Sequence, residues 1–311
     1  MLAILLVGIC CVEVALYLGI SLLLGAWDRL SAGQLALVVA LVYVGIRLAL
    51  IVLTFFLAWV FRSPRPPEMK LHVLGALRLM LGECRAFFTT FFMLVPFQIL
   101  LRRRDPKGPC PAGQRPVVLV HEIFCNGGYW RPLIRYLRRH GISHCYTINL
   151  EPPLASINRY ARDLAQYVEE VCATAQAEQV IVVGHGMGGL VGRAYVQRGG
   201  GDRRVAKIIT IATAHHGSYL AYCAAGQNVH QMRPGSVWIE GLNAEPAAAV
   251  SMTCIASIDD NLVAPQDSAQ LPHARNHVIS GVAHIAMLYA RRVHALALRE
   301  IREACLGDHV A

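Results

Sequence analysis

A glycine-rich turn is the first candidate for chemistry in this chain. A β-branched run over residues 180–183 breaks into Gly184-His185-Gly186-Met187-Gly188, and a helical sequence follows. A strand, turn and helix of this kind lift the residue at the tip of the turn into a strained position, from which a nucleophile can attack. The flanking glycines let strand and helix approach without Cβ clashes. The tip is Gly186, so the turn indicates hydrolytic chemistry but lacks the attacking atom.

An acid and a base follow the turn along the chain. Asp260, with Asp259 as the alternative, lies at the end of an expected late strand, and His284 opens the expected final helix. A carboxylate that orients a histidine, and a histidine that takes the proton of a hydroxyl, are the partners of a serine nucleophile. A surface-loop aspartate and a helix-capping histidine would explain either residue alone, whereas their joint order and spacing favour a catalytic pair.

The elements that must position these residues are expected from residue 115 onward. Short β-branched runs alternate there with helical segments, which is the pattern of a mostly parallel sheet covered by helices and therefore of the α/β class. The expected strands are residues 116–121, 145–150, 180–183, 205–212, 252–258 and 277–279, and the expected helices are 130–140, 157–175 and a closing helix over 284–305.

The stretch from residue 116 to residue 306 resembles the α/β-hydrolase fold and, within it, the bacterial triacylglycerol lipases and esterases. Four motifs carry the resemblance: VLVHEIF at 118–124, GHGMGG at 184–189, ATAHHGS at 212–218 and SIDDNLVAP at 257–265. The lipase patterns that they match are His-Gly after a strand, G-H-S-M-G-G, T-P-H-x-G-S and D-x-x-V-x-P. The resemblance implies a carboxylic-ester hydrolase without metal or other cofactor, with Gly186 at the nucleophile position, Asp260 as acid and His284 as base.

The resemblance also implies an oxyanion hole made by the backbone N–H groups of Ile123 and Met187. The chain departs from the lipase pattern beside it, because Glu122 stands where a glycine is expected. A carboxylate there would oppose a developing oxyanion unless its side chain points away or is protonated. An exposed loop glutamate is the alternative interpretation.

The other histidines of the motifs have weaker functional interpretations. His185, which precedes the nucleophile position, is expected to be structural. His215 and His216 follow Ala214, which replaces the proline of the lipase pattern. A metal role for this pair is poorly supported, since adjacent residues seldom point at one ion. The ten cysteines also lack C-x-x-C spacing, so we expect no metal site.

Three hypotheses account for Gly186. The chain is an inactivated form of a serine esterase, or a natural pseudohydrolase that binds an acyl lipid or a partner, or a hydrolase in which Asp260 and His284 activate water. The set of acid, base and oxyanion positions favours a membrane-anchored esterase or lipase, with the pseudohydrolase as the alternative. A third function, beside the esterase and the pseudohydrolase, is that of a membrane protein whose hydrolase domain serves only as an assembly surface. Such a domain would lack an acyl pocket.

The composition places part of the chain in lipid. Of its 311 residues, 55% are hydrophobic and 16% are charged, with a mean hydropathy of +0.43, which is too apolar for an ordinary soluble protein. The net charge of +9 would suit nucleic acid, but the basic residues cluster beside apolar segments. We therefore expect membrane lipids and acyl esters as partners, and no nucleic acid. The oligomeric state is left open.

Two apolar stretches, residues 1–27 and 34–61, are each long enough to cross a hydrocarbon core. A cleaved signal peptide is the alternative for the first, but no basic residue precedes it and no small-residue cleavage site closes it. Each stretch contains one central charge, Glu13 and Arg47. The two either pair across an antiparallel hairpin or lie near their own interfaces.

The positive charges predict the orientation of this hairpin. Arg62, Arg65 and Lys70 follow the second stretch, whereas the loop between the stretches carries one aspartate and one arginine. The positive-inside rule then places the amino terminus and the globular region in the cytoplasm, with the hairpin in a bacterial-type inner membrane. We accordingly divide the chain into a hairpin with its proline-rich linker (residues 1–70), a membrane-associated helix with a basic linker (71–114) and the hydrolase domain (115–311).

Residues 71–101 form a third apolar segment, followed by a basic run over residues 102–107. The segment carries the polar side chains of His72, Arg78, Glu83 and Arg85. This mixture predicts a helix that lies on the membrane surface and helps to deliver lipophilic esters. A third span is the alternative, and it would reverse the side on which the globular region lies.

Overall fold

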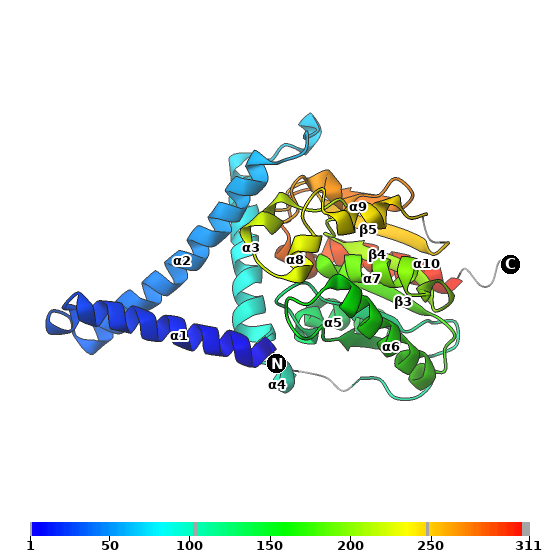
Figure 1. Ribbon diagram of the computed structural model, residues 1–311, viewed down its shortest axis with the longest axis horizontal. Helices are drawn as coiled ribbons and strands as arrows, with labels where there is room; N and C mark the ends of the chain where they lie inside the picture. Colours follow the sequence, from blue (N-terminus) through cyan, green and yellow to red (C-terminus); the bar gives the residue numbers. More distant parts are fainter. Residues whose placement is uncertain (1, 102–104, 247–248, 307–311) are drawn as a thin grey trace.

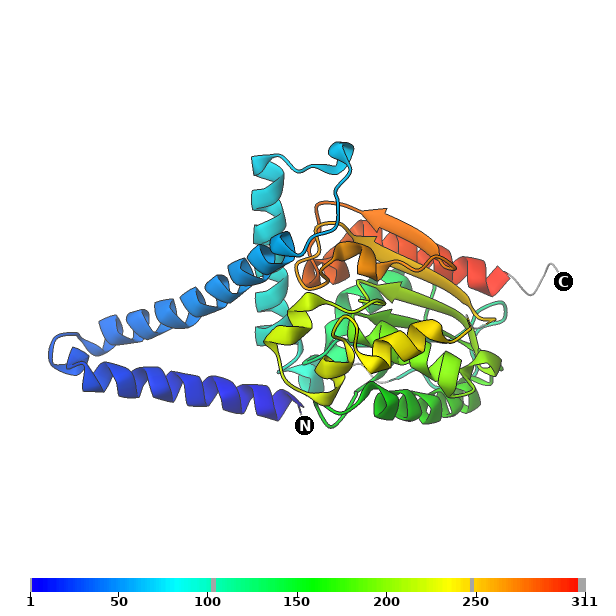
Figure 2. The ribbon, with the colours of Figure 1, turned by 45° about the horizontal axis from the view of Figure 1, so that its top comes forward.

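The computed structural model describes residues 2–101, 105–246 and 249–306. Two long helices, α1 (Leu2–Leu23) and α2 (Ala32–Val60), meet at a tip and diverge toward the rest of the molecule (Figures 1 and 2). Helix α3 (Val73–Thr89) stands between this hairpin and the α/β region, which we define as residues 115–306. Residues 102–104, the first part of the basic run that follows the third apolar segment, lie outside the described residues.

A parallel six-stranded sheet forms the centre of the α/β region, in the order β2-β1-β3-β4-β5-β6. The strands are β1 (Val117–Val120), β2 (Cys145–Ile148), β3 (Val180–His185), β4 (Val205–Ile211), β5 (Ser251–Ser257) and β6 (Arg275–Ile279). Every residue of β1 and β3 is buried, as expected for central strands that are covered on both faces. All six expected strands are present, with ends that differ by at most two residues from the predicted ones.

Helices cover both faces of this sheet. Helices α6 (Ile157–Ala175), α7 (Met187–Arg198) and α9 (Val237–Ala244) supply the apolar core on one face. Helices α5 (Arg131–Arg139) and α10 (Arg291–Leu306), with part of α3, supply the core on the other. The short helices of this region are η4 (Gly127–Trp130), η5 (Gly201–Arg203), η6 (Tyr219–Cys223), α8 (Gln227–Gln231), η7 (Gln266–Ala269) and η8 (Ile285–Tyr289).

The closing helix is not continuous, in contrast to the prediction for residues 284–305. A 3-10 turn, η8, follows His284, and Ala290 then adopts an extended conformation (ψ 118°) before α10 begins. Burial explains the break, because Met287 and Leu288 pack into the core beside α5 while the chain turns to run along the sheet. His284 therefore lies on a short turn that other elements must hold in place.

The hairpin helices have the length and composition of membrane spans. Their most apolar windows have mean hydropathies of 2.5 in α1 and 2.7 in α2, and only 0% and 17% of those windows are buried. A core helix of a soluble protein would be mostly buried, so these helices do not serve the core of the α/β region. Helix α2 follows the short turn η1 (Ala26–Asp28) and starts with a capping box made by Ser31 and Gln34.

The two central charges of the hairpin form an ion pair with each other. The Arg47 guanidinium contacts the Glu13 carboxylate across the hairpin and also lies over the ring of Tyr43, 3.7 Å from its centroid. A paired charge costs much less in an apolar environment than an isolated one. The prediction that the two charges pair across the hairpin is confirmed.

The third apolar segment is a docked helix with two apolar faces. It starts after η2 (Pro67–Met69) as α3, continues through a π-helical turn (Thr90–Leu94) and ends with α4 (Gln98–Leu101), so the expected single helix is interrupted. Glu83 and Ala86 are buried against the α/β region, whereas Leu74, Leu77 and Leu81 stay more than half exposed. Within the described residues, only α1 and α2 qualify as candidate spans.

Candidate functional site

The turn at Gly186 has the strained geometry that its sequence predicts. Gly186 adopts φ 51° and ψ −118°, between the end of β3 and the start of α7. A Cβ atom on Gly188 would lie 2.0 Å from the carbonyl oxygen of Val120, and one on Gly184 would lie 2.4 Å from the amide nitrogen of Gly189. The flanking glycines are therefore required for strand and helix to approach.

Asp260 and His284 meet beside this turn. Nδ1 of His284 lies 2.9 and 3.0 Å from the two carboxylate oxygens of Asp260, and both side chains are buried. The amides of Leu262 and Val263 donate to the same carboxylate and fix its orientation. Asp259 instead pairs with Arg65 at 2.6 Å, so the alternative acid does not contact the histidine in this structure.

Glu122 fills the space between these groups. The Ile123 amide donates to Oε1 of Glu122 at 2.6 Å, and the Met187 amide donates to both carboxylate oxygens at 3.0 and 3.1 Å. Nε2 of His284 lies 3.3 Å from Oε2. The side chain is only 13% exposed, so the interpretation as an exposed loop glutamate is wrong. The two amides expected to form the oxyanion hole thus converge on one point, and a carboxylate of the chain itself occupies it.

Glu122 also occupies the space beside Gly186, the expected nucleophile position. A Cβ atom built on Gly186 would lie 1.1 Å from Oε2 and 2.3 Å from the carboxyl carbon of Glu122. A serine at this position cannot coexist with the observed Glu122 side chain. The two departures from the lipase pattern, glutamate at 122 and glycine at 186, are therefore sterically coupled, and a serine at 186 requires the Glu122 side chain to move.

The charges of this site form an imidazolium between two carboxylates. Burial by itself lowers the pKa of His284, but the charge and hydrogen bond of Asp260, together with those of Glu122, raise it to about 10. Burial likewise opposes ionisation of Glu122, but the hydrogen bond and charge of His284 hold its pKa below the usual range. At neutral pH His284 is protonated and cannot accept the proton of a nucleophile.

Comparison with solved structures decides the fold. A Bacillus licheniformis lipase in its mature form matches with a TM-score of 0.56 and 18% identity, over 63% of this chain and 96% of that one. Aspergillus fumigatus lipase B matches with a TM-score of 0.57 and 20% identity, over 63% of this chain and 54% of that one. The α/β region has the α/β-hydrolase fold.

Sequence comparisons relate the α/β region, called the hydrolase region from here on because of its fold, to lipases and thioesterases. The family model for palmitoyl protein thioesterase matches residues 116–249. Triacylglycerol lipases of Pseudarthrobacter phenanthrenivorans and Burkholderia plantarii are each 35% identical over 118 residues, which is 35% of this chain. These matches span only 36% and 32% of the relatives' own lengths. The hydrolase region is thus lipase-like and esterase-like in sequence as well as in fold.

His185 packs against the His284 loop of this site. It is fully buried, with Nδ1 3.4 Å from the Tyr129 hydroxyl and Nε2 3.2 Å from the His284 carbonyl oxygen. Burial and the neighbouring His284 charge lower its pKa to about 3, so it is neutral. Ligand atoms of Glu122, His185 and His284 lie within 4.8 Å of one another, a spacing that a metal ion could use. These atoms already have partners within the chain, and the absence of a metal stays a prediction.

His215 and His216 lie apart from this site and do not converge on one point. Nε2 of His215 lies 3.1 Å from the Thr210 hydroxyl, in the buried layer between β4 and α7. Nδ1 of His216 is 3.2 Å from the Asn243 side-chain amide. Their contacts are those of residues that fix the segment after β4.

The helices that precede the α/β region contact the loops that carry Asp260 and His284. Glu83 of α3 accepts hydrogen bonds from the Ile285 and Ala286 amides, at 3.1 and 2.9 Å, directly after His284. Asn261 donates to the Thr54 hydroxyl of α2 at 2.9 Å and accepts from the His284 amide at 3.1 Å. The sequence interpretation missed these roles, although a glutamate within an apolar stretch was the signal available for Glu83.

Replacing Glu83 with glutamine is expected to destabilise the chain by about 1–3 kcal/mol, because an amide NH₂ would face a backbone N–H inside the protein. Burial raises the pKa of Glu83. Each of its two carboxylate oxygens accepts a hydrogen bond from a backbone amide, and a glutamine side chain has only one such oxygen. Thermal unfolding in detergent measures the effect. Glu68→Gln is the matched control, since Glu68 is exposed. Equal melting temperatures for the two variants would show that Glu83 does not support the His284 loop.

Proposed function

We propose that this chain is a membrane-anchored, lipase-like protein that binds acyl lipids and does not cleave them by a serine mechanism. The observation that supports this proposal is the Glu122 carboxylate, which takes both expected oxyanion donors and the space of the serine side chain. A substrate carbonyl oxygen and this carboxylate cannot share the two amides. The pseudohydrolase hypothesis is therefore preferred over the esterase hypothesis that the sequence alone favours.

The nature of the ligand follows from the relatives. The matching proteins are named as triacylglycerol lipases and palmitoyl protein thioesterase, which are acyl-ester and acyl-thioester hydrolases by their names. Loss of the nucleophile removes a single side-chain oxygen and leaves the contacts of a lipase-like site to the rest of an acyl ligand. Within the proposal, the acyl group binds beside Glu122 and not at the Ile123 and Met187 amides, because the Glu122 carboxylate occupies both amides and the space next to Gly186.

Ester hydrolysis is the second candidate, and the intact contact between Asp260 and His284 favours it. Residual hydrolysis would require Glu122 to leave the oxyanion amides and His284 to lose its proton, so that the histidine could activate water. These two events are linked, because the Glu122 charge is one of the causes that keep His284 protonated.

Purified full-length chain in neutral detergent separates the two candidates. We expect binding of a fluorescent fatty acid by anisotropy, with neither p-nitrophenyl ester hydrolysis above background nor fluorophosphonate labelling. The His284→Ala variant is the control for hydrolysis, since a contaminating esterase would be unaffected by it. Ester turnover that His284→Ala abolishes would contradict the pseudohydrolase proposal and establish the hydrolase.

The proposed anchor is the hairpin of α1 and α2 in a bacterial-type inner membrane, with the hydrolase region in the cytoplasm. Cys223 is exposed in that region and reports its side of the membrane. A membrane-impermeant maleimide is expected to label Cys223 in inverted vesicles but not in right-side-out vesicles. The Cys223→Ser variant identifies the signal, because other cysteines are present. Labelling of Cys223 in right-side-out vesicles would reverse the orientation.

A further inference from the structure

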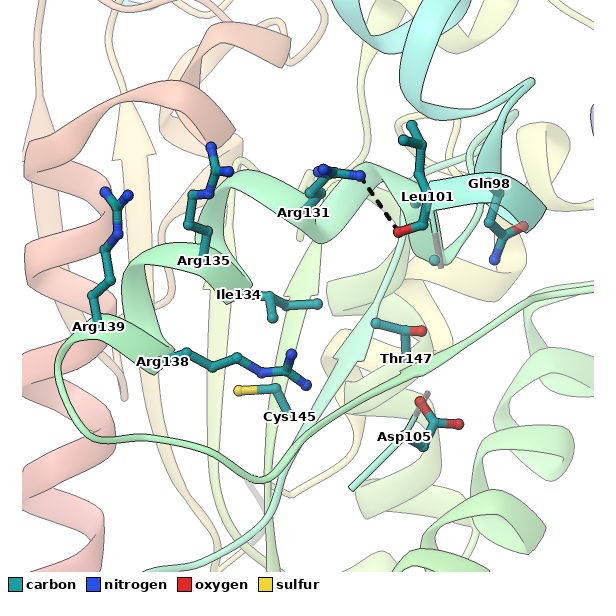
Figure 3. Close-up of a pocket in the computed structure, with 12 residues that line it drawn as sticks. Gln98, Leu101, Asp105, Arg131, Ile134, Arg135, Arg138, Arg139, Cys145 and Thr147 are labelled. Atoms are coloured by element: carbon teal, nitrogen blue, oxygen red, sulfur yellow. Dashed lines mark hydrogen bonds between the residues drawn. The ribbon is translucent and has the colours of Figure 1, made fainter. Parts of the chain in front are cut away.

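A basic pocket lies on the hydrolase region, apart from the Gly186 turn. It has a volume of about 400 Å³ and is bounded by α5, α4, η4 and β2. Four arginines of one helix line it, Arg131, Arg135, Arg138 and Arg139. Figure 3 shows Arg131 reaching toward Leu101 at one end, while Arg138 lies beside Cys145.

Among the described residues that line this pocket, positive charges outnumber negative ones. The four arginines have no ion-pair partner within the part of the chain that the structure describes, and Arg131 bonds only the Leu101 carbonyl oxygen, at 3.4 Å. Among the described lining residues Asp105 carries the single carboxylate. Arg131, Arg135 and Arg139 are spaced i, i+4 and i+8 on α5, where like charges repel each other and destabilise a helix. An anion in the pocket would relieve this repulsion.

The surroundings of the pocket indicate the source of such an anion. Leu101 and Gln98 of α4 form one wall, and the segment that leads to them exposes Met93, Phe97 and Leu100 at 61%, 50% and 80%. In Figure 1, α4 lies beside the amino-terminal end of α1, at the end of the hairpin that faces the hydrolase region. An apolar edge next to clustered arginines is the arrangement that binds a lipid at the bilayer surface.

We propose that this pocket binds the phosphate group of an anionic glycerophospholipid. Guanidinium groups of the α5 arginines that line the pocket hold the phosphate oxygens through charge-assisted hydrogen bonds, and the acyl chains leave along the exposed side chains of residues 93–100 into the bilayer. The same chemistry would suit free phosphate, but an exposed apolar edge adds nothing to the binding of a small soluble ion. The assignment rests on the proposed membrane anchoring and gives it a specific lipid contact.

Isothermal titration of the full-length chain in neutral detergent tests this assignment. The probes are dihexanoyl phosphatidic acid, dihexanoyl phosphatidylcholine and inorganic phosphate. We expect the phosphatidic acid to bind most tightly, and we expect Arg135→Gln with Arg138→Gln to weaken it at least about tenfold. Arg159→Gln with Arg162→Gln is the matched control, since both of these arginines are exposed on α6.

Three results would overturn the assignment. An equal loss in the α6 control would show unspecific charge attraction, and inorganic phosphate that binds as tightly as the lipid would assign the pocket to a soluble anion. Unchanged lipid binding in a folded Arg135→Gln, Arg138→Gln variant would remove the site altogether. Because the titration is done in detergent, it is read separately from the Cys223 labelling, so failure of the pocket and failure of the anchoring are distinguishable.

Discussion

Replacing Glu122 with glycine and Gly186 with serine in the same chain is expected to raise p-nitrophenyl ester hydrolysis at least about 10³-fold, a small part of the roughly 10⁶-fold effect of losing a triad nucleophile. The double variant frees the Ile123 and Met187 amides for an oxyanion and places a hydroxyl beside His284. Loss of the Glu122 charge also removes one of the causes that keep His284 protonated. The new serine is expected to react covalently with fluorophosphonates.

The single variants are the controls for this experiment. Gly186→Ser alone would place its Cβ atom 1.1 Å from Oε2 of Glu122, so it must expel that carboxylate from its hydrogen bonds and should gain little activity. Glu122→Gly alone opens the oxyanion amides but supplies no nucleophile. A double variant that folds, yet shows neither labelling nor a gain in rate, would mean that the site has changed beyond these two positions.

The sequence predicts the backbone of this site well because local rules determine it. Buried β-branched runs identify the strands, and the glycines at 184, 186 and 188 identify a tight turn whose strain is seen as the positive φ of Gly186. The spacing of Asp260 and His284 likewise brings two loops to the same edge of a parallel sheet, where they meet at 2.9 Å. These features depend on residues that are near each other in sequence or on the order of the strands.

The direction of a single side chain and the partner of an apolar face are not local properties. Glu122 reaches the amide of Met187, 65 residues away, only because the absence of a side chain at 186 leaves room for it. Helix α3 is apolar on two faces, and its composition does not distinguish a bilayer from a protein surface as the partner of either face. The structure shows the partner of one face. Glu83 lies on that face and accepts hydrogen bonds from the turn after His284, so this face packs on the α/β region.

The ion pair between Glu122 and His284 is expected to make stability depend on pH. The pKa of His284 is raised from 6.5 to about 10 in the folded chain, so its contribution is complete below about pH 6.5 and is lost as the pH rises toward 10. The lowered pKa of Glu122 acts in the opposite direction, and its contribution is lost as the pH falls below about 4.5. Melting temperatures should therefore decline between pH 6.5 and 10, on a scale of a few kcal/mol of stability.

Two variants test the origin of this decline. The His284→Gln variant removes the titrating group and should lose this part of the decline. The Glu122→Gln variant leaves only Asp260 to raise the pKa of His284 and should shift the decline to lower pH. A His284→Gln variant that declines as steeply as the unsubstituted chain would show that His284 is not a protonated partner of Glu122, and the site would then be open to general-base chemistry at neutral pH.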